Sequence, residues 1–140
     1  MTGKIPKKKP REGIDEYGRN DIHYADTSTK IENLINEGFD INLQDDNGWS
    51  PMHFYAQDSN VSAIQAALKS GANPNLVDSH GNGPLWTATM NARGEFSCVI
   101  ALLKAGANPN HKNKHGRSPL DMANTIKEGL ENVYAKYQNA

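Results

Sequence analysis

The chain has 140 residues and is expected to form one domain, since domains typically span about 50–250 residues. Its 15 basic and 16 acidic residues leave a net charge of −1, and its one cysteine excludes an intrachain disulfide and any multi-cysteine metal site. No apolar run approaches the ~20 residues of a membrane span, and no hydrophobic segment follows the basic N-terminus, so we expect no secretory signal and a cytoplasmic protein.

Residues 1–12 contain five basic residues, one acidic residue and two prolines, a net charge of +4. A run of like charge interrupted by proline indicates a solvated, flexible arm. Its basic residues at 7–11 also fit a nuclear address or a nonspecific, salt-dependent contact with nucleic acid. Specific nucleic-acid binding is not expected, because the arm has no aromatic side chains to stack on bases.

Two phrases repeat along the rest of the chain. The phrase at residues 71–75 recurs unchanged at 106–110, and a weaker copy lies at 38–42, so its glycines are 33 and 35 residues apart. A second phrase follows a glycine each time; its copies lie at residues 50–53, 83–86 and 118–121, with a degraded copy at 20–23. Two interleaved phrases at one period indicate a repeat architecture.

One unit predicts two helices and an extended finger. Ser50 is a good N-cap and Pro51 fits the first helical position, and a second helix follows the polar break at residues 57–60. The expected apolar stripes are Met52, Tyr55 and Ala56 on the first helix, Val61, Ile64, Ala67 and Leu68 on the second, and Phe96, Val99, Leu102 and Leu103 on the second helix of the next unit. Gly71 closes the second helix, and residues 73–81 form the finger, with a turn near 78–81.

This unit resembles the ankyrin repeat, whose marks are a T-P-L-H-x-A phrase, a 33-residue period and two helices with a turn. The resemblance implies an all-α repeat solenoid of about four units, near residues 15–44, 45–77, 78–112 and 113–140, within a single domain at 13–140. The first unit is short and the third gains residues near 91–95, between its helices. Atypical end units are expected, because terminal repeats present a polar outer face.

Histidine and cysteine often serve in catalysis or metal binding, but the positions of these residues in the repeat give each of them a structural interpretation. The resemblance implies that His23 and His53 brace adjacent fingers rather than act in catalysis. His111 and His115 lie on an expected finger, where helical ligand spacing does not apply, so we expect no metal. Cys98 is expected to be a buried small hydrophobe. We therefore predict no enzyme, no catalytic residue and no cofactor.

The resemblance implies that a partner protein binds the concave face, which is formed by the finger tips and the first helices. The candidate residues are Glu16, Tyr17, Arg19, Asp46, Asn47, Trp49, Gln57, Asp58, Ser79, His80, Asn82, Met90, Asn91, Lys114, His115 and Arg117. Trp49 is the foremost candidate, because it buries nothing obvious within its own repeat and exposed tryptophans are favoured hot spots; packing on a neighbouring finger is the alternative. We expect its removal to weaken binding and to leave folding nearly intact. Trp86 replaces the repeat histidine and faces the same groove, or else packs between first helices.

Charge is unevenly distributed along the chain. Residues 13–60 carry a net −8 and residues 61–140 a net +3. An acidic first half favours a partner with a basic surface, because complementary charge speeds encounter; a solvated acidic face is the alternative. The most specific hypothesis is an immunity protein, a monomer on its own, that masks a toxin domain. The alternative is a regulatory or host-directed interaction protein that uses the basic arm.

Overall fold

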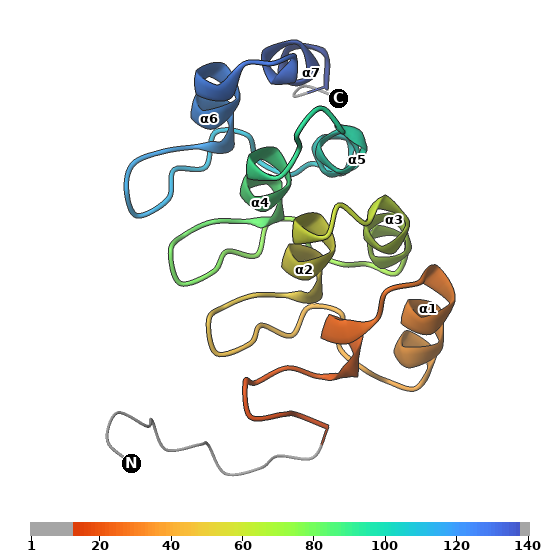
Figure 1. The fold of residues 1–140 in the computed structure, drawn as a ribbon. Helices are drawn as coiled ribbons and strands as arrows, with labels where there is room; N and C mark the ends of the chain where they lie inside the picture. The colour runs from red at the N-terminus through yellow and green to blue at the C-terminus, as the bar shows by residue number, and fades with distance from the viewer. Residues whose placement is uncertain (1–12, 138–140) are drawn as a thin grey trace.

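A computed structural model describes residues 13–137, and the expected arm at residues 1–12 lies outside this part of the chain. The elements in chain order are the 3-10 helix η1 (Asp21–Tyr24) and the α-helices α1 (Ser28–Asn36), α2 (Pro51–Gln57), α3 (Val61–Lys69), α4 (Pro84–Met90), α5 (Ser97–Lys104), α6 (Pro119–Ile126) and α7 (Leu130–Tyr137). They pair into four stacked layers, so the all-α solenoid expected from the sequence is confirmed (Figure 1).

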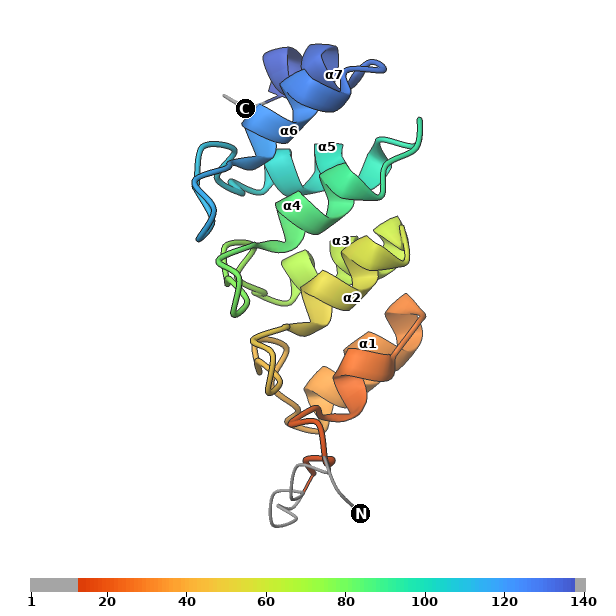
Figure 2. The ribbon, with the colours of Figure 1, turned by 60° about the vertical axis from the view of Figure 1, so that its left-hand side comes forward.

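The layers form two rows of helices. η1, α2, α4 and α6 stack in one row, and α1, α3, α5 and α7 in the other (Figure 1). The turned view shows the same succession of steps, with the loops that precede the first helices gathered on one side (Figure 2). We call these loops the first to fourth fingers; they comprise residues 13–20, 37–50, 70–83 and 105–118.

Local sequence explains where the helices begin and end. At the start of α6, Asp121 N–H donates to Ser118 Oγ at 3.1 Å, and Ser118 N–H donates to the Asp121 carboxylate at 2.9 Å. This reciprocal cap, followed by Pro119, satisfies donors that a helix start leaves free. Gly71 follows the end of α3 with a φ of 93°, a conformation that side chains disfavour.

Two elements differ from the simple repeat. The first unit has Asp21 where the others have proline, and it forms only the single 3-10 turn η1. Phe96, expected on the second helix of the third unit, instead lies one residue before α5. The inserted residues explain the shift, because Arg93 and Gly94 both adopt positive φ and carry the chain through an extra turn.

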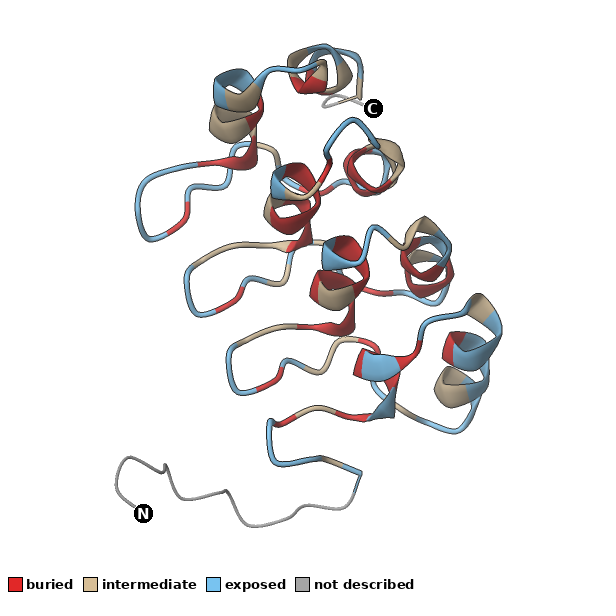
Figure 3. Cartoon of the chain, viewed as in Figure 1, coloured by how far each residue is buried: buried red, intermediate tan, exposed pale blue. Residues whose placement is uncertain are grey.

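The core is a thin layer between the two rows (Figure 3). Ala56, Ala88 and Ala123 are buried in successive first helices, where their small side chains let neighbouring units approach closely. Leu102 is fully buried in the second row, and Cys98 is buried beside it, as expected. Burial raises the pKa of the Cys98 thiol to about 11, and this thiol is therefore protonated at neutral pH.

Hydroxyl groups also tie successive units together. Tyr55 in α2 is fully buried and donates to the backbone oxygen of Ile22 in η1 at 2.5 Å. Tyr134 in α7 is buried and shares a 2.5 Å hydrogen bond with Thr89 in α4. Among residues 13–137, no helix combines the length and the apolar character needed to cross a bilayer.

Candidate functional site

Each finger is shaped by an acidic or amide side chain at the start of its turn. The residues are Asp15, Asp45, Asp78 and Asn113. In each case Oδ1 accepts the backbone N–H groups two and four residues further on, at 2.8 to 3.1 Å. A glycine of positive φ completes the turn, Gly48 at 82° and Gly81 at 81°. Side chains that hydrogen-bond their own backbone in this way hold a turn without help from a sheet.

In the second, third and fourth fingers, the second polar atom of this turn-starting side chain is bonded to the preceding finger. Arg19 Nε donates to Asp45 Oδ2 at 2.9 Å. One unit further on, Trp49 Nε1 donates to Asp78 Oδ2 at 3.0 Å. At the third junction, between the third and fourth fingers, the direction reverses, and Asn113 Nδ2 donates to the side-chain oxygen of Asn82 at 3.0 Å. Positions 19, 49 and 82 are equivalent in the repeat, and each therefore links its finger to the next.

Trp49 is half-buried in the structure. Its ring stacks on His53 at 5.3 Å between centroids, and the edge of Phe54 lies 5.0 Å away. The expectation that this indole buries nothing within its repeat is wrong, because residue 49 lies directly over the start of α2. Its contact with Asp78 is the packing on a neighbouring finger that was the alternative. The rest of its surface still lines the groove described below.

Two buried histidines bridge successive units, as the resemblance implied. His23 Nε2 donates to the backbone oxygen of Trp49 at 3.0 Å, and His53 Nε2 donates to that of Asn82 at 2.9 Å. In both rings Nδ1 accepts the backbone N–H of the N-cap residue, at 3.2 and 3.1 Å, so the neutral ring carries its proton on Nε2. Burial lowers the pKa of both histidines.

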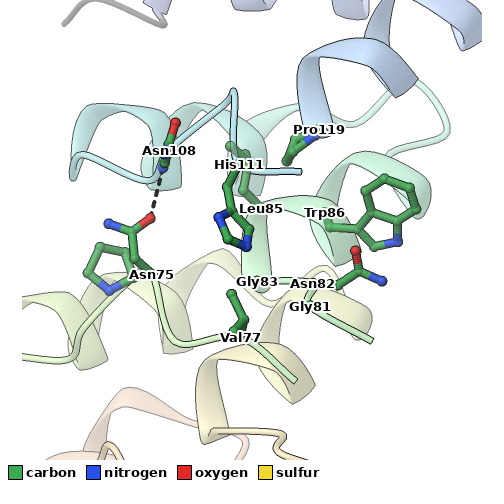
Figure 4. Close-up of a pocket in the computed structure, with 11 residues that line it drawn as sticks. Asn75, Val77, Gly81, Asn82, Gly83, Leu85, Trp86, Asn108, His111 and Pro119 are labelled. Carbon is green, nitrogen blue, oxygen red and sulfur yellow. Dashed lines mark hydrogen bonds between the residues drawn. The ribbon is translucent and has the colours of Figure 1, made fainter. Parts of the chain in front are cut away.

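Trp86 takes the histidine position in the third unit, and the junction changes there. Within the described residues, no side chain of α4 bridges to the backbone oxygen of Arg117 as the histidines do elsewhere. A cavity of about 290 Å³ lies between the third and fourth fingers, with Leu85, Trp86, His111 and Pro119 among its lining residues (Figure 4). Trp86 and Asn82 line both this cavity and the groove.

The concave face contains an open groove of about 680 Å³ between the fingers and the first helices. Nine of the sixteen expected residues line it: Arg19, Asn47, Trp49, Gln57, Ser79, His80, Asn82, Met90 and Asn91. The other seven, Glu16, Tyr17, Asp46, Asp58, Lys114, His115 and Arg117, are exposed but lie outside the groove lining. The groove is therefore centred on the second and third units, and the first and fourth fingers extend beyond it.

Trp86, which was expected to face the groove or to pack between first helices, lines it, and sequence reasoning did not select four further lining residues, namely Asp45, Phe54, Asp78 and Thr87. The two aspartates recur 33 residues apart, three residues before a glycine, and this spacing could have identified them. The sequence contains no comparable spacing signal for Phe54, which directly follows the repeat histidine His53. In the structure its ring lines the groove and packs against Trp49 and Arg19.

The groove floor is acidic and aromatic. Arg19 is fixed over the rings of Tyr17 and Phe54, at 4.8 and 4.7 Å, and its charge is paired with Asp45. Burial acts against the charge of this guanidinium, but its hydrogen bonds to Tyr24 and Asp45 outweigh burial and raise its pKa. The Asp78 carboxylate is hydrogen-bonded by neutral donors only, so the described floor keeps one net negative charge.

Histidine and acidic side chains are also possible metal ligands. Among residues 13–137, no group of three or more histidine, cysteine, aspartate or glutamate side chains is placed to hold a metal ion. His111 and His115 lie in the fourth finger and not on a helix, as the repeat register predicted.

Comparison with known proteins identifies the class. A family model described as ankyrin repeats (3 copies) matches residues 22–113, which is more than half of the chain. The chain therefore belongs to the ankyrin-repeat family, a non-enzymatic class of modules that generally mediate protein–protein interaction. It is also similar to neurogenic locus notch homolog protein 1 of Homo sapiens, with 40% identity over 58 residues. That match covers 41% of this chain and 2% of the relative.

Proposed function

We propose that the groove binds a partner protein through a basic surface of that partner. The observation that carries this proposal is the combination of aromatic rings and an uncompensated carboxylate, Asp78, in one concavity. Aromatic faces attract the cationic groups of lysine and arginine, and desolvated tryptophan rings are frequent binding hot spots. A basic side chain lying over Trp49 or Trp86 would gain both contacts.

The surroundings of the groove add to this attraction. Asp46 and Asp58 are exposed in the second unit beside the groove, and residues 13–60 carry a net charge of −8. An acidic field of this kind raises the rate at which a basic partner is captured and suppresses partners of like charge. The bonds between fingers hold the surface in one shape, which reduces the entropy lost on binding.

The most specific form of this function is inhibition, in which the chain masks a basic functional surface of a toxin domain. The acidic groove supports this form, because a rigid concave surface covers its partner by binding alone and needs no chemistry. The alternative, a regulatory or host-directed protein that uses the basic arm, stays a prediction, because residues 1–12 lie outside the described part.

Crosslinking from defined positions tests the groove directly. A photoreactive benzophenone residue is placed at Gln57, which lines the groove, and in a matched variant at Gln65, which is exposed on α3. The partner captured through Gln57 is purified and its affinity measured against the wild type and against Asp58→Lys. We expect capture from Gln57 alone, and at least about tenfold weaker binding after charge reversal.

Equal capture from both positions, or unchanged affinity of Asp58→Lys, would contradict a groove for basic partners. The inhibitory form has its own readout. The captured partner is expressed alone and together with this chain, and the inhibitory form predicts growth arrest that co-expression relieves. A partner that is harmless when expressed alone eliminates the inhibitory form and leaves the groove proposal standing.

A further inference from the structure

We propose that the outer edge of the fourth finger is a second docking site, which binds an acidic turn of a partner protein. The turn has the form Asp-x-x-Gly, and it docks as each finger of this chain docks on the preceding one. This inference rests on the proposed function only in requiring a protein partner, since none of the groove contacts takes part.

The backbone supplies three internal examples of this docking. The N–H of the residue after each turn-starting aspartate or asparagine donates to a backbone oxygen of the preceding finger. Asp46 N–H donates to Tyr17 O at 2.9 Å, Ser79 N–H to Asn47 O at 3.0 Å, and Lys114 N–H to His80 O at 3.0 Å. A turn of the same geometry therefore docks in the same way at each of these three junctions.

Side chains supply two further contacts that recur. At the first junction the carboxylate of Asp45 accepts from Arg19 Nε at 2.9 Å. At the base of the fingers, Asn73 N–H donates to Asn42 Oδ1 and Asn108 N–H donates to Asn75 Oδ1, both at 2.8 Å. An incoming finger is thus held by a backbone oxygen, an asparagine oxygen and the side chain that precedes the N-cap.

The fourth finger presents the same three groups without an occupant among the described residues. His115 O is equivalent to the oxygens of Tyr17, Asn47 and His80, and it accepts no hydrogen bond in this part of the chain. Asn110 Oδ1 and the exposed guanidinium of Arg117 are likewise unpaired there. Figure 1 shows why, because this light-blue finger has a neighbouring finger on one side only.

Charge decides which kind of turn fits. The fourth finger, residues 105–118, contains Lys112, Lys114 and Arg117 and no acidic residue, whereas the second finger, residues 37–50, contains four acidic residues and no basic one. Arg117 occupies the position at which Arg19 holds an aspartate, so a carboxylate is the matching group.

The helices beside this finger limit the size of the occupant. The exposed residues of α6 and α7 are polar or small; they are Asn124, Thr125, Asn132, Ala135 and Lys136. No large apolar side chain of these described helices is fully exposed to another helical repeat, and Met122, Ile126 and Val133 are only partly exposed. The occupant is a turn held by the finger edge.

The probe is a peptide with the sequence of the second finger's turn, which docks on the first finger in the structure. The full chain is labelled with ¹⁵N and titrated with a backbone-cyclised peptide of the sequence of residues 43–50, Leu-Gln-Asp-Asp-Asn-Gly-Trp-Ser. We expect saturable NMR shifts of the Arg117 Nε–H and of the amides at 114–118. Arg117→Gln should weaken binding about tenfold or more, because hydrogen bonds between charged groups are the strong ones.

Controls separate this site from general attraction between charges. Lys69→Gln removes one exposed positive charge at the end of α3, outside the fourth finger, and should leave the affinity unchanged. A peptide with asparagine in place of its first aspartate should bind as weakly as the wild-type peptide binds Arg117→Gln. Equal loss in Lys69→Gln, or no saturable shift at Arg117 at millimolar peptide, would overturn the proposal.

Two other occupants are outcomes of the same experiment. Tighter binding of a twelve-base-pair DNA duplex than of the peptide at Arg117 would overturn the assignment to an acidic turn. Self-association in sedimentation that is lost in Arg117→Gln would replace the partner by a second copy and overturn it as well. Failure here leaves the crosslinking result from Gln57 untouched, so the two proposals fail separately.

Discussion

Trp49 provides the sharpest test of the structure, because it combines two roles that sequence reasoning kept apart. Its N–H is bonded to the Asp78 carboxylate at 3.0 Å, and its ring packs on His53 and Phe54. Hydrogen bonds to charged groups typically contribute about 1.5–3 kcal/mol, and aromatic pairs about 0.5–1.5 kcal/mol beyond burial. Because Trp49 is half-buried and these contributions are not additive, Trp49→Ala should lower the free energy of unfolding by about 2–4 kcal/mol.

Trp49→Phe divides this loss into its parts. The phenyl ring keeps the stacking on His53 but has no N–H for Asp78, so we expect a loss of about 1–2 kcal/mol. Urea denaturation followed by circular dichroism measures both variants. Met90→Ala serves as the control, because this exposed groove residue should change stability by less than about 0.5 kcal/mol. A Trp49→Ala variant as stable as this control would refute the link between fingers.

Three further predictions concern the scaffold. Leu102→Ala should lower the free energy of unfolding by about 2–5 kcal/mol in urea denaturation, because this fully buried side chain leaves a cavity, and a smaller loss than 1 kcal/mol would contradict its core position. Burial lowers the pKa of His23 and His53 in the folded state, so the unfolded chain binds protons first as the pH falls. The free energy of unfolding should be at its full value well above the unfolded histidine pKa of about 6.5 and should decrease as the pH falls through about 6.5 toward the lowered folded values; a flat profile would contradict the neutral bridges. Gly48→Ala should lower the thermal unfolding temperature more than Gly71→Ala. Both glycines have positive φ, but a Cβ at residue 48 would lie 2.8 Å from the third finger's backbone, whereas a Cβ at residue 71 would meet open space. Equal decreases in the unfolding temperature would show that the fingers separate freely.

The fold was predictable because the repeat encodes it locally. The N-cap of Ser118, the proline after it and the closing Gly71 each act within a few residues of themselves. Burial of Leu102 and Cys98 followed from helical spacing. The misplaced start of α5 at Phe96 shows the limit, because an insertion shifts the register and one sequence does not reveal where the extra turn lies.

The candidate site was less predictable, because its geometry arises between units. The side chain of Trp49 meets a carboxylate 29 residues away, and helical or strand periodicity contains no information about that pair. The repeat position of Asp78 did contain a signal, since its equivalent Asp45 has the same spacing to a glycine. What it bonds depends on the residue that the preceding finger places opposite, which is an arginine in one unit and a tryptophan in the next.

The row at positions 19, 49, 82 and 117 couples stability to recognition. Its first three members bond to the next finger, and all three also line the groove. A substitution that changes the groove at these positions therefore also loosens a junction, whereas Gln57 and Met90 line the groove and make no side-chain hydrogen bond with any described residue. Binding specificity is therefore expected to change most easily at Gln57 and Met90. Arg117 is released from this constraint, because no finger follows it within the described residues, and its guanidinium is left to a partner.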